Sequence, residues 1–592
     1  MRKNLMKIRS SKRGIKLVLF FFMTFSFSSN STLNAQVIKD KVDDIKEDIS
    51  NRLEKPFSIS GSFGINLGFY ESFGIAARRD RLSYLLMANV NLNLLGIGMD
   101  MPLDGNFSQL EASFLQPFNQ IGISPRYKWA TAHLGYRNMT FSPLTLNGHT
   151  FLGVGLELTP PIKSDVLTFR LSAMYGRLRR PVKPVDAAVE NVAPTYRRMG
   201  YGVKFGVAGK KQATNYIDLI LFRGFDQVNS IQQPLGNDAV KPEDNLVLGV
   251  SGQYQLFKGL TLKADWAISA LTQDSRSEVT EEDVPIFSSV KGVFTPRIST
   301  QVNQSVKSAL SYSFLTYNLS LKYNRIAPDY RTLGSYFFQN DLEEYTFNAG
   351  ALFKEGKTSV NGSVGFQENN LNGELENRSK RVIGSVNVNQ VVSPKLNVYA
   401  TYSNFSSSLL VVKEELSDSL DFYQVTTGYT IGANYNIGTK ERQQSISGNL
   451  SYQTANSRDE YSVSDITTEF ITGGLFYNWF IKKKNIGLNA AINYTRSNSQ
   501  DMISTIVGPG ISLIKKFPDK KISLKYYLSY RTNFQEGDPI FNILQNRIGA
   551  DYKITKHHIL GLKLRHLYKI DTVDSEKTYS EIQGVMTYRF VF

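Results

Sequence analysis

The sequence predicts an all-β fold: a transmembrane, up-and-down antiparallel β-barrel of about 24 strands, in a range of roughly 22–28. Three observations predict it. Segments of about ten residues alternate between apolar and polar side chains, short and long connections take turns between these segments, and many of the apolar rows end in tyrosine. A short amphipathic helix is expected ahead of the barrel.

The alternation is clearest in "KISLKYYLSYRTN", residues 521–533. Successive side chains of a β-strand point to opposite faces, so this stretch has one apolar and one mostly polar face. The apolar face carries Ile522, Leu524, Tyr526, Leu528 and Tyr530. The apolar face of such a strand packs against either a protein core or lipid, and the pattern of the other segments indicates which of the two it is.

Short and long connections alternate from Leu246 to the end of the chain. The short ones are "LFKGL", "FKEGKT", "VVSPK", "IGTKE", "FIKKKN", "KFPDKK" and "ITKHH". The longer ones are 272–303, 326–343, 368–379, 405–422, 454–464, 531–541 and 570–578. Outer-membrane barrels have this construction, with short periplasmic turns and longer external loops.

The strands that follow the short connections end their apolar rows in tyrosine. Leu319, Leu321 and Tyr323 share one face, and the same ending recurs at Tyr402, Tyr452, Tyr494 and Tyr530. A soluble core has no reason to place a phenol at one height on strand after strand, whereas a bilayer stabilises the amphipathic ring at headgroup level. The apolar faces are therefore expected to meet lipid.

The opposite faces of these strands are polar and suit the lumen of a barrel. They carry Ser320, Lys322, Asn397, Thr401, Ser445, Ser447, Asn449, Asn489 and Asn493. Counting strands back from the last one, "YSEIQGVMTYRFVF", assigns residues 57–592 to the barrel. Residues 95–125 break the alternation and are expected to form an insertion in the lumen or on the periplasmic side.

The amino terminus has the layout of a secretory signal peptide over residues 1–35. A basic region precedes the apolar run "LVLFFFMTFSF", and a polar stretch follows up to Ala35. The apolar run is too short for a transmembrane helix. Export followed by insertion as a barrel predicts the outer membrane of a Gram-negative bacterium as the location.

Residues 36–56 are expected to form an amphipathic helix and a linker in the periplasm. Ile38, Val42, Ile45, Ile49 and Leu53 recur at helical spacing, and a proline follows at position 56. Two interpretations remain open: residues 37–55 dock a periplasmic partner, or the helix packs under the mouth of the barrel.

Composition excludes several classes of protein. The chain has no cysteine, so neither a disulfide scaffold nor a lipid anchor on cysteine can form. The formal charge is +16, and removing the seven basic residues of the signal region leaves 61 Lys+Arg against 52 Asp+Glu, or +9. Spread over more than five hundred residues, this excess does not indicate nucleic-acid binding.

The export signal, the alternating strands and the carboxy-terminal "YRFVF" resemble Gram-negative outer-membrane β-barrel proteins. The start at Gln36 and the stretches "SPRYKWATAHLGYRNMTFSPLTLNGHTF" and "PDYRTLGSYFFQNDLEEYTFN" look like barrels of the Bacteroidota. The resemblance implies contact with outer-membrane lipid and lipopolysaccharide, and insertion by the barrel-insertion machinery. TonB-dependent receptors are similar in size but carry a plug domain, for which residues 36–56 are too short.

No catalytic array is evident, and an enzyme is not expected. The five histidines are His133, His149, His557, His558 and His566, and none has a neighbour in the sequence that suggests a relay. An acidic loop from Asp274 to Asp283 has oxygen ligands for calcium, but its spacing matches no known calcium loop. No cofactor or metal is expected.

Basic residues supply the candidate functional side chains. The loop 177–198 holds six Lys/Arg against Asp186 and Glu190, a net charge of +4, and lies on the external side by strand count. Its arginines and four basic side chains in the lumen phase of three strands are candidates for attracting anions. They are Arg177, Arg179, Arg180, Arg197, Arg198, Lys322, Lys525, Lys563 and Arg565.

The sequence thus favours an outer-membrane channel or transport protein for polar or anionic solutes. A barrel of about 24 strands encloses a lumen that must either conduct or be filled. The alternative is a non-conducting barrel subunit of a secretion, assembly or surface-attachment complex.

Overall fold

The computed structural model describes residues 57–94, 97–106, 120–162, 164–183, 194–210, 214–231, 240–280, 292–336, 339–374, 380–411, 420–459, 466–499 and 502–592. The signal peptide 1–35 and the helix 36–56 expected from the sequence lie outside these residues. Residues 59–93 and 97–592 make up one compact unit. Within the described ranges, no helix has the length and apolar character needed to cross a membrane.

The described residues form 26 β-strands and two short 3-10 helices, η2 (Val228–Ser230) and η4 (Ser575–Lys577). The strands are β1 (Phe57–Phe73), β2 (Leu82–Leu94), β3 (Ile97–Asn106), β4 (Gln120–Tyr127), β5 (Ala130–Thr140), β6 (Asn147–Leu158), β7 (Leu167–Arg179), β8 (Arg197–Gly209), β9 (Tyr216–Gln227), β10 (Asp244–Phe257), β11 (Leu260–Thr272), β12 (Thr300–Phe314), β13 (Tyr317–Ile326), β14 (Leu342–Phe353), β15 (Thr358–Glu368), β16 (Lys380–Val391), β17 (Leu396–Val411), β18 (Leu420–Asn436), β19 (Arg442–Asp459), β20 (Ile466–Ile481), β21 (Ile486–Ser499), β22 (Met502–Phe517), β23 (Ile522–Gln535), β24 (Asp538–Lys553), β25 (His558–Asp571) and β26 (Tyr579–Val591).

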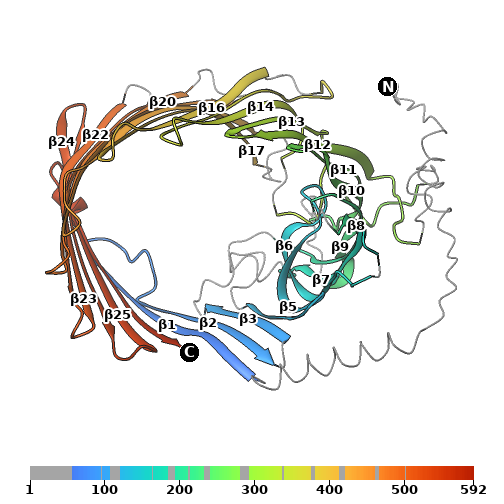
Figure 1. Ribbon diagram of the computed structural model, residues 1–592, viewed down its shortest axis with the longest axis horizontal. Helices are drawn as coiled ribbons and strands as arrows, with labels where there is room; N and C mark the ends of the chain where they lie inside the picture. The colour runs from blue at the N-terminus through green and yellow to red at the C-terminus, as the bar shows by residue number, and fades with distance from the viewer. Residues whose placement is uncertain are drawn as a thin grey trace. The chain divides into compact units, whose positions relative to one another are not determined.

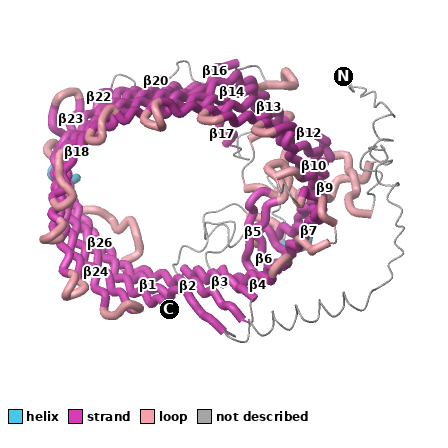
Figure 2. Tube along the Cα trace, viewed as in Figure 1, coloured by secondary structure: helices cyan, strands magenta, loops and turns pink. Residues whose placement is uncertain are grey.

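All of these strands belong to one sheet in which each strand pairs with the next along the chain. The sheet curls so that its last strand returns to its first (Figures 1 and 2). β26 pairs antiparallel with β1 from Ser62 opposite Val591 to Phe73 opposite Ser580. The all-β, antiparallel, up-and-down architecture expected from the sequence is therefore confirmed.

The segment expected to be an insertion, residues 95–125, differs from the prediction. It contains β3 and most of β4, which pair with each other from Gly98 opposite Arg126 to Asp104 opposite Gln120. These two strands account for the difference between the 24 expected strands and the 26 observed. Each contains a proline, Pro102 and Pro125, and a proline within an apolar run argues against a strand when only the sequence is considered.

The short connections are confirmed as turns, but several of the expected long loops are mainly strand. β17 continues to Val411 and β19 to Asp459, so the ranges 405–422 and 454–464 extend the sheet. In 531–541, β23 and β24 are joined by Glu536 and Gly537 alone, at φ 52° and 99°. Two consecutive residues with positive φ are what a tight hairpin turn of the type I′ kind requires.

The outer face of the sheet carries a continuous apolar band. One row runs across four strands through Leu513, Tyr526, Ile548 and Leu564, each directly opposite the next. These side chains are 46%, 38%, 51% and 41% exposed. Leu564 alternates with Arg565, which lines a cavity under the loop between β1 and β2 inside the curled sheet (Figure 1), so the apolar row lies on the outer face. The face predicted for Leu524 and Tyr526 from alternation is confirmed.

Aromatic side chains border this band at both ends. At the long-loop end, the ring centroids of Tyr402 and Tyr429 lie 5.0 Å apart, and Tyr429 lies 6.5 Å from Tyr452. At the short-turn end, Tyr317 contacts Phe353 with centroids 6.0 Å apart. The first row is the one that the sequence predicts. The second was not predicted, because its members lie next to the turns and do not end a regular row.

The inner face of the sheet is mostly polar from β12 to β22, although β20 places Phe476 and Phe480 on it. Neighbouring strands exchange hydrogen bonds between hydroxyl and amide side chains across this face. They include Ser311–Ser320 at 3.0 Å, Ser363–Ser385 at 3.0 Å, Asn387–Thr401 at 2.9 Å and Thr430–Ser451 at 3.0 Å. The predicted polar phase of Ser320 and Thr401 is thus confirmed as the face opposite the apolar band.

Candidate functional site

The candidate site is the inner face of the sheet, which has two different parts. On β5–β11 the inner face is buried: in β9, Ile217 and Leu219 on the outer face are exposed, while Ile220 and Phe222 on the inner face are not. Two connections cover it, residues 141–146 between β5 and β6 and residues 327–336 between β13 and β14. We call them the packed loops.

The packed loops form an apolar core with the strands beneath them. Phe141, Leu144, Leu146 and Tyr330 are buried in one cluster with Phe222. Other members from the strands are Phe151, Met174, Leu178, Ile220, Val247 and Ala267. Burial of this many large apolar side chains holds the loops against the sheet.

Hydrogen bonds join the two packed loops to each other. The Tyr330 hydroxyl donates to the Leu144 carbonyl at 2.6 Å, and the Thr332 hydroxyl donates to the Thr145 carbonyl at 2.9 Å. Burial raises the pKa of the Tyr330 hydroxyl well above its usual range, so this group remains a neutral donor. The loops therefore act as one packed unit although about 190 residues separate them in the sequence.

Asn245 fixes the second packed loop to the strands. Its fully buried side-chain amide donates to the Ser269 hydroxyl at 2.7 Å and to the Ala270 carbonyl at 3.0 Å, and its oxygen accepts from the Leu333 amide at 3.0 Å. A buried amide with partners on both its oxygen and its nitrogen is rigid.

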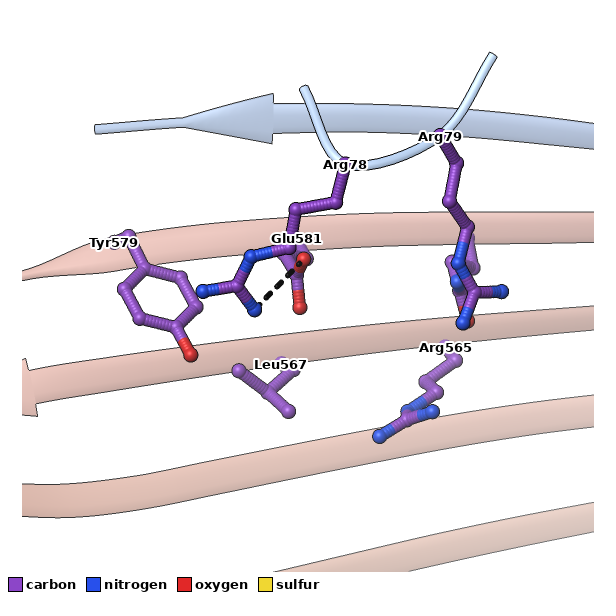
Figure 3. A pocket seen from close by; sticks show the side chains of 7 residues that line it. Arg78, Arg79, Arg565, Leu567, Tyr579 and Glu581 are labelled. Atoms are coloured by element: carbon purple, nitrogen blue, oxygen red, sulfur yellow. Dashed lines mark ion pairs between the residues drawn. The ribbon is translucent and has the colours of Figure 1, made fainter. Parts of the chain in front are cut away.

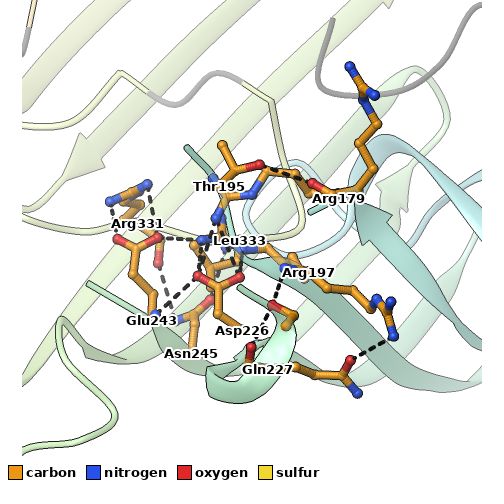
Figure 4. A network of polar contacts seen from close by, with 12 residues as sticks. Arg179, Thr195, Arg197, Asp226, Gln227, Glu243, Asn245, Arg331 and Leu333 are labelled. Atoms are coloured by element: carbon orange, nitrogen blue, oxygen red, sulfur yellow. Dashed lines mark hydrogen bonds and ion pairs between the residues drawn. The ribbon is translucent and has the colours of Figure 1, made fainter. Parts of the chain in front are cut away.

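A buried ion network lies beside Asn245 (Figure 4). Arg198 donates twice to Asp226, both at 2.8 Å, and once to Glu243 at 2.6 Å. Arg331 of the second packed loop also reaches Glu243, at 2.6 Å. Arg179 approaches Asp226 at 3.2 Å. The Asp226 side chain is 0% exposed, so its negative charge depends on these guanidinium groups.

The network changes how the arginines of loop 177–198 are interpreted. Arg179 and Arg198 are held by carboxylates, and their charge is largely compensated inside the protein. Arg177 donates to the Tyr136 hydroxyl at 2.8 Å, and Arg180 also has an interaction within the protein. Arg197 is the exposed member and reaches Gln227 at 3.5 Å. Residues 184–193 of this loop lie outside the described residues.

The other predicted basic residues lie in the inner-face phase of their strands. Lys322 is opposite Ala309 and Thr346, and Lys563 is opposite Gly549 and Val585. Lys525 lies 3.8 Å from Asp551, which compensates part of its charge. Arg565 is opposite Arg547 and Gln583. Lys322 on β13 is thus far along the sheet from the other three, which lie on β23 and β25, on either side of β24.

Sequence reasoning missed Asp226, Glu243 and Arg331, because their partners lie on other strands. The stretches 124–151 and 328–348 contain most of both packed loops, but nothing in either stretch alone indicates that the two pack together.

Sequence reasoning also found no companion for His133, whereas the fold supplies two. The His133 Nδ1 lies 2.8 Å from the Ser124 hydroxyl, and its Nε2 lies 3.5 Å from a Glu157 oxygen. A hydrolase relay uses these side-chain types. It also needs hydrogen-bond donors that stabilise an oxyanion, so these three side chains alone do not make a hydrolase site. Within the described part of the chain, no group of three or more His, Asp or Glu side chains is arranged to hold a metal ion.

Comparison with known proteins gives low similarity throughout. No protein-family model and no curated protein matches the sequence. Among solved structures, a mutant of the ferric enterobactin receptor PfeA from Pseudomonas aeruginosa is 10% identical, with a TM-score of 0.41 over 90% of this chain and 80% of that one. The P pilus usher PapC translocation pore is 10% identical, with a TM-score of 0.33 over 90% and 99%. OccAB4 of Acinetobacter baumannii is 12% identical, with a TM-score of 0.27 over 67% and 99%. Similarities at this level assign neither a family nor a function.

Proposed function

We propose that this protein is an outer-membrane β-barrel channel or transport protein for polar or anionic solutes. The observation that carries the proposal is the contrast between the two faces of one sheet that returns to its first strand: an exposed apolar band outside and hydrogen-bonded polar side chains inside. This contrast suits lipid on one side and water on the other.

The dimensions of the band support a bilayer. On β24, Tyr552 lies at the short-turn end and Leu544 lies opposite Tyr530 at the other end. The eight residue-to-residue steps from Leu544 to Tyr552 span about 27 Å along the strand, before strand tilt shortens this height. The apolar band of outer-membrane barrels is about 25 Å tall. Tyrosine and phenylalanine at both borders match the aromatic girdles of such barrels.

The inner face supports a solute path along β12–β22 rather than along β5–β11. The packed loops bury the inner face of β5–β11, whereas the inner face of β12–β22 is lined by serine, threonine and asparagine side chains. The same packed loops favour the second candidate function, a non-conducting barrel subunit of a secretion, assembly or surface-attachment complex. In that case the interior serves as a rigid support for a partner.

Planar lipid bilayers distinguish the two functions. Purified full-length protein is expected to produce stepwise ionic currents after insertion. The absence of currents from correctly folded protein, together with a partner that co-purifies from native membranes, would favour the subunit of a complex. Outer-membrane lipid, lipopolysaccharide and the barrel-insertion machinery are the partners that either function requires.

The charge of the inner face predicts a mild preference for anions. Lys322, Lys563 and Arg565 lie on this face, and clefts lined with one sign of charge concentrate counter-ions. Reversal potentials under a gradient of potassium chloride should indicate anion selectivity that weakens above about 0.1 M salt, where screening acts beyond about 10 Å. Cation selectivity would show that these residues do not govern permeation.

A further inference from the structure

A cavity of about 480 Å³ lies on the inner face where the loop between β1 and β2 meets the last strands (Figure 3). It is lined by Arg78 and Arg79 of that loop, Arg565 of β25, and Tyr579, Glu581 and Gln583 of β26. The blue loop of Figure 1 extends inside the curled sheet here, and Figure 3 shows its two arginines directed toward the strands.

The side chains of the cavity leave an excess of positive charge. Three arginines face one carboxylate, Glu581, a net charge of +2. Glu581 is already engaged, because it accepts a hydrogen bond from Tyr70 at 2.7 Å and lies 3.7 Å from Arg78. Arg78 also stacks over the Tyr579 ring at 5.0 Å. Arg79 and Arg565 have no carboxylate within ion-pair distance among the residues that the structure describes.

A fourth arginine increases this excess at the edge of the cavity. Arg547 lies directly opposite Arg565 in the pairing of β24 with β25. Like charges at opposite positions of a sheet destabilise it unless something compensates them. Arg547 stacks over the Tyr527 ring at 5.3 Å and donates to the neutral Gln545 at 3.0 Å, so neither contact neutralises it. The Nε of Arg565 is buried without a hydrogen-bond partner in the described structure.

We propose that this cavity is a binding subsite for a phosphate group carried by a soluble solute. Guanidinium groups present several donors in a planar fork that matches the oxygens of phosphate, and Arg79 and Arg565 have donors to spare. The phosphate neutralises the charge that the fold leaves between β24, β25 and the loop between β1 and β2. The inference deepens the proposed function and rests on it, since the subsite lies on the inner face of the same sheet, at β25 and β26, which follow the strands assigned to the solute path.

Calorimetric titration of detergent-solubilised full-length protein with inorganic pyrophosphate at low salt tests the subsite. We expect saturable binding that weakens about tenfold or more in Arg565→Gln and in Arg79→Gln, because each substitution removes charged hydrogen bonds. Lys395→Gln is the control: it removes one exposed positive charge in the turn between β16 and β17, outside the cavity, and should leave the affinity unchanged. Heat-dependent gel migration checks that each variant is folded.

The outcomes test the phosphate subsite independently of the channel function. Equal affinity of the wild type, Arg565→Gln and Arg79→Gln would overturn the subsite, even in a protein that conducts. Loss of binding in these two variants supports it, even in a protein that produces no current. Binding of micelles of a phosphate-headed lipid without any binding of pyrophosphate would also overturn it, because the occupant would then be a lipid and not a solute.

Discussion

Replacing Asp226 with alanine is expected to destabilise the protein by about 3–5 kcal/mol, because it leaves the buried guanidinium of Arg198 without its main partner. Arg179 loses the same carboxylate. The loss should appear as a lower midpoint in denaturant unfolding of the detergent-solubilised protein. It should also make the second packed loop more sensitive to proteolysis, since Arg331 shares Glu243 with Arg198.

A double variant serves as the control for this prediction. Replacing a buried ion pair by apolar side chains of similar size is often close to neutral, whereas removing one partner is costly. Asp226→Leu combined with Arg198→Met should therefore be more stable than Asp226→Ala alone. If Asp226→Ala unfolds at the wild-type midpoint, the network does not hold this side of the sheet.

Arginine at position 524 is the second change with a large expected effect. Leu524 belongs to the outer apolar band and is 43% exposed there. An arginine on the lipid face costs about 2–4 kcal/mol at the bilayer midplane and less toward the borders. Leu524 lies opposite Ala550, between the middle of the band and its border at Tyr552, so a cost toward the lower end of this range is expected. We expect Leu524→Arg to reduce the fraction of protein that inserts into liposomes, measured by protection of the strands from protease.

Ser523→Arg is the matched control, because position 523 is next in the chain and points to the inner face opposite Asp551. The new guanidinium would lie near a carboxylate and water, so insertion should be close to that of the wild type. Equal insertion of both variants would mean that the assignment of the two faces is wrong.

The faces of the strands could be predicted because alternation is a local property. Each residue of "KISLKYYLSYRTN" alternates with its neighbours, so the row Leu524–Tyr526 was assigned without knowledge of its partners. Pairing with β22 and β24 then placed Tyr526 between Leu513 and Ile548. β3 and β4, which fall in the stretch 95–125 where the alternation breaks, lack this local signal and were missed.

The packed loops could not be predicted, because their packing depends on contacts across the sheet. Tyr330 meets Leu144 at a separation of 186 residues, and nothing in either segment alone specifies the other. The ion pair between Arg198 and Glu243 could not be predicted either, because in the sequence each residue looks like a separate surface charge. For this reason the loop arginines appeared to be free to attract anions, whereas two of them are structural.

The cavity lined by arginines could also be predicted only in part from the sequence. Arg565 was identified from its phase in the strand, but Arg79 lies in a turn and Arg547 lies on the neighbouring strand. Only the register of β24 with β25 places Arg547 and Arg565 side by side. Alternation predicts which face a side chain takes, and pairing decides which neighbours it has.

The proposed path along the inner face can be tested with single cysteines, since the chain has none of its own. Asn387→Cys places a thiol on the inner face beside Thr401, and Val386→Cys places one on the outer face, where Val386 is 42% exposed. A charged, water-soluble methanethiosulfonate reagent is added to single channels of each variant in planar bilayers. We expect a stepwise fall in current for Asn387→Cys and no change for Val386→Cys. An unchanged current in Asn387→Cys whose thiol has been shown to react, or no current from either folded variant, would contradict a conducting path along this face.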